Sequence, residues 1–432
     1  MKEAILQTRL CHLITTRYQA HIWDTYMTRV RVPGEQEQQQ VAVVVVTKIM
    51  NFISTLILSL LTLLTLTQSI NAAVLPEDRV DVLYHNYDGG GITIDGPSVL
   101  VRKSVADQVS VSANYYADNI SSASIDAVTQ ASAYTESRTQ QSLGVDYLND
   151  KSTLSYSFTT SVENDFDATT HSFGISQEMF GSMTTMSLGY SIGDNIITKT
   201  GDDAFLKSSG FRDYRASLSQ VLTKNLIMSL SYDIITDKGF LNNPYRNIRY
   251  LDPSVADGYS FLLEKYPETR TTNAASVSLR YFLPYRAAIY GSYRYFTGSW
   301  GIKADTYEIG YVHPLEENWT FETSFRYYTQ TQANFYSDLF PESDPTIGPQ
   351  NIFARDKELS TFSDINLSFG VTYEFESDDL LFFERGSASF FYTYMSYDYE
   401  NFRDIRVSAT PGTEPLYSFT AGVTRLYVSF WF

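Results

Sequence analysis

Hydrophobic and polar residues alternate along most of the chain with a period of two, the period of a β-strand whose two faces meet different surroundings. Residues 365–375, INLSFGVTYEF, place an apolar side chain at every odd position and a small or polar residue at nearly every even one. Residues 153–158 (TLSYSF) and 186–192 (MSLGYSI) alternate in the same way. Each run extends over about 10 residues, the length that a tilted strand needs to cross a bilayer.

Sixteen such segments can be placed along the chain. They begin near residues 79, 97, 108, 135, 151, 168, 182, 212, 225, 270, 285, 303, 318, 360, 384 and 418. Tight connections alternate with longer ones, of which the longest are 119–134, 194–211, 236–269, 331–358 and 399–417. This pattern predicts an all-β fold, a transmembrane antiparallel β-barrel of about 16 strands with short periplasmic turns and long extracellular loops.

A soluble sandwich or propeller is the alternative, because its strands alternate as well. In this chain, however, one face carries Tyr and Phe beside aliphatic residues, while the other is Ser, Thr, Gly, Asn, Asp and Arg in strand after strand. Prolines avoid the middle of every segment, where they would break the hydrogen-bonded ladder. A polar lumen inside a lipid-facing wall explains these observations better than a soluble core.

An apolar run of 15 residues, Phe52–Leu66, precedes the first segment and is short for a spanning helix, which needs roughly 20. Lys48 lies before it and the small residues Ala72 and Ala73 follow, so we expect a secretory signal with cleavage after Ala72 and export to the bacterial outer membrane. A permanent anchor is the alternative.

The signal has an unusual position, because about fifty residues precede it. Translation is expected to begin near Val46 or Met50, and an extended signal peptide is the alternative. The expected division is therefore a spurious extension over 1–45, a signal peptide over 46–72 and a single barrel domain over 73–432.

Charge and composition narrow the partners. The chain has 32 basic and 49 acidic residues, a formal net charge of −17, and this balance disfavours nucleic acid. Its single cysteine, Cys11, precedes the barrel domain, so the domain is expected to lack disulfides and thiol chemistry. Outer-membrane lipid is the expected surroundings, and no cofactor or metal is expected, because no His, Cys and Asp cluster has ligand spacing.

The last residues, LYVSFWF, read as the closing strand of the barrel. They resemble the C-terminal signature of bacterial outer-membrane proteins, which the barrel-assembly machinery recognises. The side chains that carry it are Leu426, Val428, Phe430 and Phe432. Upstream, Phe419, Ala421 and Val423 have the opposite parity, which predicts a β-bulge near Thr424 and Arg425. Trp300, Trp319 and Trp431 fall at segment ends and are expected in the interfacial girdles.

Charged residues on the face opposite the apolar one are candidates for the lumen wall. They are Arg280, Arg286, Arg294, Glu308, Glu322 and Arg326. A turn near residues 316–317 would bring Glu308 opposite about residue 325, within reach of Arg326. A register slip would send arginine into lipid at a cost of roughly 2–4 kcal/mol. These groups form either a selective constriction or ion pairs that only fill the lumen.

Catalysis has little support, and the protein is not expected to be an enzyme. The barrel domain has three histidines, and neighbours such as His171 and Ser172 point to opposite faces of a strand. His85 and His313 are expected at interfaces or turns. An outer-membrane hydrolase with a cross-strand Ser–His pair is the weaker alternative. The Gly-rich run 87–96 (YDGGGITIDG) is expected to form a hairpin loop, since a phosphate cradle needs a following helix.

Residues 278–311, 325–338 and 355–371 resemble an outer-membrane β-barrel family of unknown function, domain-of-unknown-function family 3570, and residues 95–129 are similar to its opening. The resemblance implies a bacterial outer-membrane barrel without an established activity. Neighbouring genes in such families often encode thioredoxin-like proteins, a small lipoprotein and a flavin transferase. We therefore expect a porin-like channel or conduit for small solutes, with a barrel anchor for an envelope redox or assembly system as the alternative.

Overall fold

The structure, a computed structural model, describes residues 74–122, 125, 134–341, 352–376 and 383–432. The predicted extension over 1–45, the signal peptide over 46–72 and its cleavage site at Ala72 lie outside the described residues. No helix in the described part of the chain is long and apolar enough to cross a membrane.

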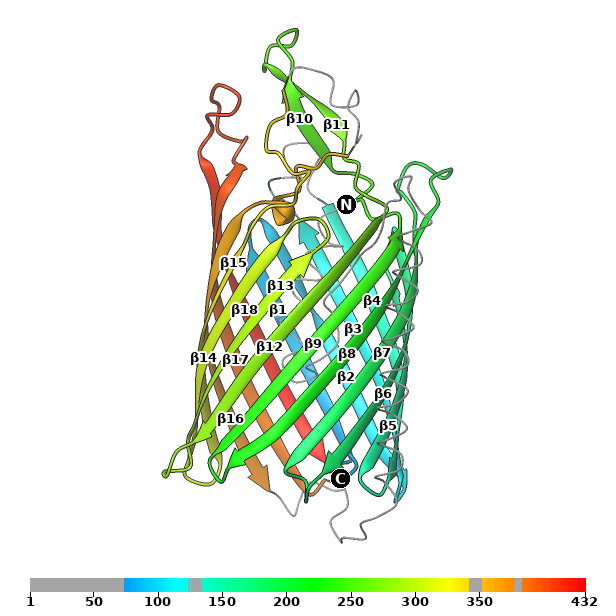
Figure 1. The fold of residues 1–432 in the computed structure, drawn as a ribbon, viewed down its shortest axis with the longest axis vertical. Coiled ribbons are helices and arrows are strands. Elements are labelled where there is room, and N and C mark those ends of the chain that lie inside the picture. Colours follow the sequence, from blue (N-terminus) through cyan, green and yellow to red (C-terminus); the bar gives the residue numbers. More distant parts are fainter. Residues whose placement is uncertain (1–73, 123–124, 126–133, 342–351, 377–382) are drawn as a thin grey trace, which may run out of the picture.

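Sixteen antiparallel strands close into a barrel, as the sequence predicts (Figure 1). The barrel strands are β1 (Arg79–Gly89), β2 (Ile92–Ala106), β3 (Val109–Ser122), β4 (Tyr134–Asn149), β5 (Ser152–Val162), β6 (Phe166–Met179), β7 (Thr184–Ile197), β8 (Lys207–Thr223), β9 (Leu226–Gly239), β12 (Thr269–Phe282), β13 (Ala288–Gly298), β14 (Lys303–Leu315), β15 (Trp319–Gln330), β16 (Phe362–Glu376), β17 (Arg385–Arg403) and β18 (Leu416–Trp431). Each lies beside its neighbours in the chain, and β1 pairs with β18 to close the sheet. The largest differences from the predicted starts are in β2 and β8, which begin about five residues earlier because these strands continue past the alternating run.

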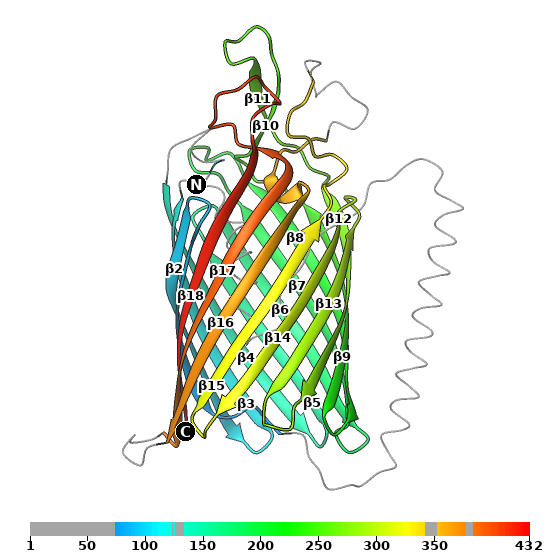
Figure 2. The same cartoon turned by 90° about the vertical axis from the view of Figure 1, so that its left-hand side faces the viewer.

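The two ends of the barrel differ (Figures 1 and 2). At the turn end, strands join through tight turns such as 107–108, 150–151 and 224–225. At the loop end, the long segments 240–268, 331–361 and 404–415 connect neighbouring strands. The first of these segments contains the hairpin of β10 (Asn247–Leu251) and β11 (Tyr259–Leu263), which projects from the barrel. The segment 331–361 contains the short helix η1 (Lys357–Leu359).

The Gly-rich run forms the hairpin loop predicted for it. Gly90 and Gly91 have φ angles of 60° and 79° and make a two-residue turn between β1 and β2. Positive φ angles suit glycine, which has no Cβ, and turns of this kind match the twist of the paired strands.

The strand faces follow the predicted parity. Residues such as Leu279, Ile309 and Phe325 point outward and are 40–56% exposed, as expected for side chains that meet lipid. Unbroken pairing of β18 with β1 from Ala421 to Trp431 shows that the bulge predicted near Thr424 and Arg425 does not form. The side chains of Ala421 and Val423 instead point into the barrel and are buried there.

Candidate functional site

Serine residues cover one side of the inner wall. Register pairs join Ser176, Ser187, Ser217, Ser231 and Ser276 in a row that crosses five neighbouring strands, from β6 to β12. All five are half-buried, and two neighbouring pairs in this row lie within hydrogen-bond distance, at 3.0 Å and 2.7 Å. Small hydroxyl groups take little of the lumen and can both donate and accept hydrogen bonds.

A second serine row leads directly to the predicted charges. Ser219, Ser229, Ser278 and Ser292 are joined by register pairs from β8 to β13. Ser292 lies opposite Glu308 on β14, and Glu308 lies opposite Arg326 on β15. The first row ends in a similar way, because Ser276 lies opposite Arg294. The hydroxyl wall is therefore continuous with a charged segment of the lumen.

Five of the six predicted lumen residues lie on the inner face: Arg280, Arg294, Glu308, Glu322 and Arg326. Arg286 does not, because it lies in the β12–β13 turn with a φ of 64°. Its guanidinium donates to the backbone oxygen of Glu316 in the next turn, at 3.2 Å. The sequence prediction for Arg286 is wrong because its strand begins at Ala288, three residues later than the pattern indicates.

The Glu308–Arg326 register agrees with the sequence to within one residue. Both side chains belong to the inner face, and Arg326 forms an ion pair with Asp364 on β16, at 2.8 Å. Other inner-wall arginines are paired as well: Arg102 with Asp146 at 2.5 Å and Arg215 with Asp233 at 2.6 Å. Charges along the wall therefore compensate one another locally.

Inner-face aromatic rings lie flat against the wall where the neighbouring strand has a glycine. A Cβ at Gly310 would lie 2.1 Å from the ring of Tyr290, and one at Gly370 would lie 2.3 Å from the ring of Phe391. Only glycine leaves room for a ring in this position. Packing against glycine keeps these large rings close to the wall and away from the barrel axis. The guanidinium carbon of Arg280 lies over the Tyr290 ring, 5.3 Å from its centroid.

The loop end near the β1–β18 seam is filled by an apolar cluster that the sequence did not reveal. It contains Tyr87, Ile94, Phe362, Met395, Tyr397, Tyr399 and Phe402 together with residues of β18, and Ile125 from the β3–β4 connection joins it. We call this the seam cluster. Apolar side chains in a membrane strand usually point outward, so an apolar cluster on the inner face is an exception to the alternating pattern.

Next to the seam cluster, His85 is buried on the inner wall, which corrects its expected place at an interface or turn. Its Nε2 lies 2.8 Å from Asp118, and its ring stacks on Tyr116. His171 and Ser172 point to opposite faces as expected, and Tyr156 contacts His171 on the outer face at 3.0 Å.

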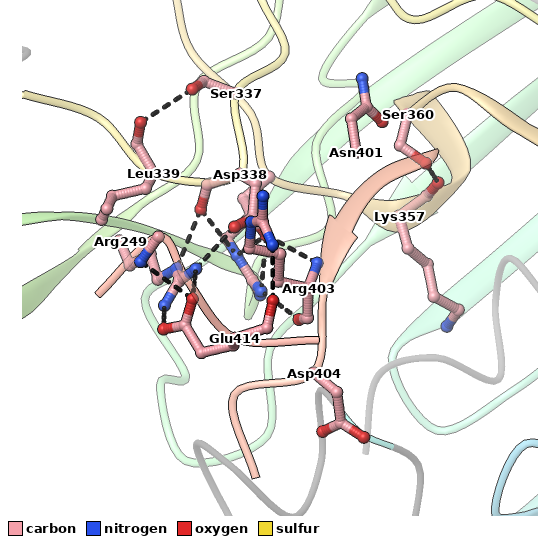
Figure 3. Close-up of polar contacts among 12 residues, drawn as sticks. Arg249, Ser337, Asp338, Leu339, Lys357, Ser360, Asn401, Arg403, Asp404 and Glu414 are labelled. Carbon is pink, nitrogen blue, oxygen red and sulfur yellow. Dashed lines mark hydrogen bonds and ion pairs between the residues drawn. The ribbon is translucent and has the colours of Figure 1, made fainter. Parts of the chain in front are cut away.

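The loops at the loop end are joined by a buried charge network (Figure 3). The Arg249 guanidinium is fully buried and donates to both carboxylate oxygens of Glu414, at 2.5 Å and 3.1 Å, and to Asp338 at 2.5 Å. Arg355 pairs with the other oxygen of Asp338 at 2.9 Å, and Arg403 donates to the Glu414 backbone oxygen. The network connects three loop segments into one unit, which we call the loop cap.

Electrostatics within the loop cap follow from these contacts. Burial alone would raise the pKa of Glu414, but the hydrogen bond from Arg249 and its charge outweigh burial, and the pKa lies below its ordinary value. Burial would lower the pKa of Arg249, yet Glu414 and Asp338 raise it. Both groups are therefore charged at neutral pH.

The three tryptophans differ in their surroundings. Trp319 begins β15 at the turn end, points outward and is 41% exposed, a placement that fits an interfacial girdle. Trp300 is only 5% exposed and packs against Tyr266 and Phe335 in the loop cap, so its expected girdle position is wrong. Trp431 shares the inner face with Ser429, and Arg385 lies over its ring at 4.3 Å, so it does not face lipid either.

The C-terminal side chains take the predicted outer face. Leu426 is 49% exposed, and Val428 and Phe430 share its parity on β18. Phe430 contacts Phe383 from the neighbouring connection, and Phe432 lies under Lys103 of β2. Recognition by the assembly machinery stays a prediction.

A family model described as a protein of unknown function (DUF3570) matches residues 130–393, more than half of the chain. The chain belongs to this family. The matched range includes the stretches between 278 and 371 that carried the resemblance in the sequence. Comparison with curated proteins finds no match.

Solved structures share the barrel at low identity. They include a bacterial polysaccharide outer membrane secretin (9% identity, 83% of this chain and 100% of that chain covered, TM-score 0.43). The siderophore receptor PirA from Pseudomonas aeruginosa (10%, 76% and 60%, TM-score 0.39) and outer-membrane expressed OmpT of Vibrio cholerae (10%, 83% and 100%, TM-score 0.39) are further examples. Similarities of this size carry no argument about function.

Proposed function

We propose that this outer-membrane barrel is a porin-like conduit for small polar solutes. The observation that carries the proposal is the pair of serine rows on the inner wall, which together present half-buried hydroxyls across six neighbouring strands, from β6 to β13. A wall of small polar side chains is typical of a hydrated lumen, and barrels of about sixteen strands are wide enough to contain one.

The charges favour small solutes without a strong net charge. Three inner-wall arginines, Arg102, Arg215 and Arg326, are each matched by a nearby carboxylate, which weakens their long-range field on an ion. Hydroxyl groups can replace the hydrogen bonds that a polar solute loses when it leaves water. The seam cluster places buried apolar side chains inside the loop end, and we expect it to limit the size of what passes.

Planar-bilayer recording of the refolded protein tests the proposal. We expect discrete conductance steps from the native barrel, and a smaller step from Ser231→Trp, whose side chain would project into the lumen. The matched control is Leu230→Trp, one position away on the outer face of β9, which should conduct as the native protein does. Absence of conductance above baseline in the native protein would contradict the proposal.

A second recording tests whether the charged segment is part of the conduit. Glu308 continues a serine row, so Glu308→Gln should shift ion selectivity toward anions. If the charges only fill the barrel, the same change should lower stability and leave selectivity unchanged.

The proposal includes no catalysis, and an activity-based serine probe should leave the folded protein unlabelled. An anchor for a periplasmic thioredoxin-like protein or a lipoprotein would need a binding surface at the turn end, where turns such as 107–108 and 150–151 present few side chains. Co-purification of such a partner from native membranes, together with absent conductance, would favour the anchor.

A further inference from the structure

Arg280 differs from the paired arginines of the lumen. It lies on the inner face of β12, two residues before this strand ends at the turn end, and its side chain is exposed. Arg102, Arg215 and Arg326 each bind a carboxylate. Arg280 forms no ion pair or hydrogen bond with any residue that the structure describes, so its charge faces the lumen without a local counter-charge.

An aromatic ring holds the Arg280 guanidinium against the wall. The guanidinium carbon lies 5.3 Å from the ring centroid of Tyr290, its register partner on β13. The ring has a fixed place, because Gly310 leaves room for it on β14 and its hydroxyl donates to Glu322 on β15 at 3.2 Å. A cation–π contact uses the charge of a guanidinium and none of its N–H donors. Arg280 is therefore positioned while its donors stay available to a solute.

Three serine hydroxyls surround Arg280 on the inner face. Ser278 precedes it by two positions on β12, and Ser229 and Ser292 lie opposite Ser278 on the two neighbouring strands. Diagonal neighbours of this kind are about 7–8 Å apart, within reach of one long side chain. All three serines are half-buried. We call Arg280 and these serines the lumen arginine site.

We propose that the lumen arginine site binds the carboxylate of a small polyhydroxylated acid, such as a sugar acid, as it passes through the barrel. This inference rests on the proposed conduit and names its class of solute. The planar fork of a guanidinium donates two parallel hydrogen bonds to a carboxylate. Serine hydroxyls both donate and accept, so they suit the hydroxyl groups of the same solute. A single carboxylate is favoured, because Glu308 lies beyond Ser292 on β14 and would repel a second negative charge.

Block of the ion current by added solutes tests the site on the refolded full-length barrel. The probes are gluconate and sorbitol, which has the same carbon chain with an alcohol group in place of the carboxylate. At constant ionic strength, gluconate should block at a lower concentration than sorbitol. Arg280→Gln should raise the half-blocking concentration of gluconate about fivefold, the effect of one exposed ion pair, and leave that of sorbitol unchanged.

The matched control is Arg286→Gln, the same substitution in the β12–β13 turn. The Arg286 guanidinium donates to the backbone oxygen of Glu316 and lies outside the site, so this variant should respond to both probes as the native protein does. An equal loss of gluconate block in both variants would overturn the proposal, since it would show a general attraction of anions to the turn end. No block by gluconate, equal block by the two probes, or an unchanged value in Arg280→Gln would overturn it as well.

Absence of current through the native barrel would contradict the conduit and leave the site to a second measurement. Saturation-transfer NMR of gluconate with the folded barrel in detergent then decides. A signal that Arg280→Gln loses supports the site, and an absent or equal signal overturns it. Heat-modifiable migration on gels reports whether each variant has folded, and Arg280→Ser takes the place of Arg280→Gln if the latter does not fold.

Discussion

Removal of the Arg249 guanidinium should release the loop cap and leave the barrel intact. In Arg249→Met, Glu414 would remain buried without its guanidinium partner, and Asp338 would keep only the guanidinium of Arg355. Loss of one partner from a buried ion pair costs about 3–5 kcal/mol. Because every 1.4 kcal/mol is tenfold in an equilibrium constant, opening of the cap should become about one hundred to several thousand times more frequent.

Hydrogen exchange measures that opening directly. The amides of Leu251 and Phe340 bond the β10 hairpin to the segment 331–361, at 3.0 Å and 2.9 Å, and both should lose protection in Arg249→Met. Amides in the middle of the β6–β7 ladder should keep theirs, because the backbone pairing of the two strands protects them. The control is Arg406→Met, which removes a partly exposed ion pair with Asp404 worth about 0–1 kcal/mol. Equal loss of protection in both variants would show that the buried network does not hold the cap.

Three further predictions concern pH, the lumen wall and assembly. The pKa of Glu414 is depressed in the folded protein, so its ionised carboxylate stabilises the cap above the ordinary Glu value of 4.5, and this stabilisation is lost as pH falls through the folded pKa. Amide exchange of the cap should therefore accelerate below pH 4.5. No change in exchange down to pH 3 would contradict the assignment. Gly310→Val should push the Tyr290 ring into the lumen, lower the conductance and reduce the free energy of unfolding by about 1–3 kcal/mol. Gly174→Ala should change neither conductance nor stability, because the added Cβ would lie 3.6 Å from its nearest neighbour, an ordinary van der Waals distance. Phe432→Ala should reduce barrel assembly in cells but not refolding in detergent; equal yields in cells would remove the assembly-signal interpretation.

The barrel could be predicted from the sequence because successive residues of a strand face lipid and the lumen in turn, so apolar and polar side chains alternate. A strand that has apolar residues at every second position can satisfy both only in one register, and the short turn at 316–318 fixes the pairing of β14 with β15. The alternating pattern therefore places Glu308 and Arg326 on the same face, nearly opposite each other.

The same parity rule failed where the inner wall is apolar. The predicted bulge near Thr424 depends on the parity of Phe419, Ala421 and Val423, and it does not form because Ala421 and Val423 point into the barrel. Only packing against Tyr87 and Phe362 of other strands explains their inward direction. The loop cap could not be predicted for a related reason, because Arg249 and Glu414 are 165 residues apart and no local pattern marks them as partners.

The seam cluster and the serine rows lie on different sides of the barrel, so the inner face is apolar at the seam and rich in hydroxyl groups on the other side. Closure of the sheet depends on the pairing of β1 with β18, the two strands farthest apart in the chain, so this seam carries the largest loop-closure cost. Tyr87 of β1 and Val423 of β18 face each other there and are buried in the seam cluster, which adds apolar burial to the backbone hydrogen bonds of the closing pair. Strands β6 to β9 pair with neighbours close in sequence and need no such support. Their inner face is therefore able to consist of small hydroxyl side chains, which leaves this side of the wall available for a hydrated path.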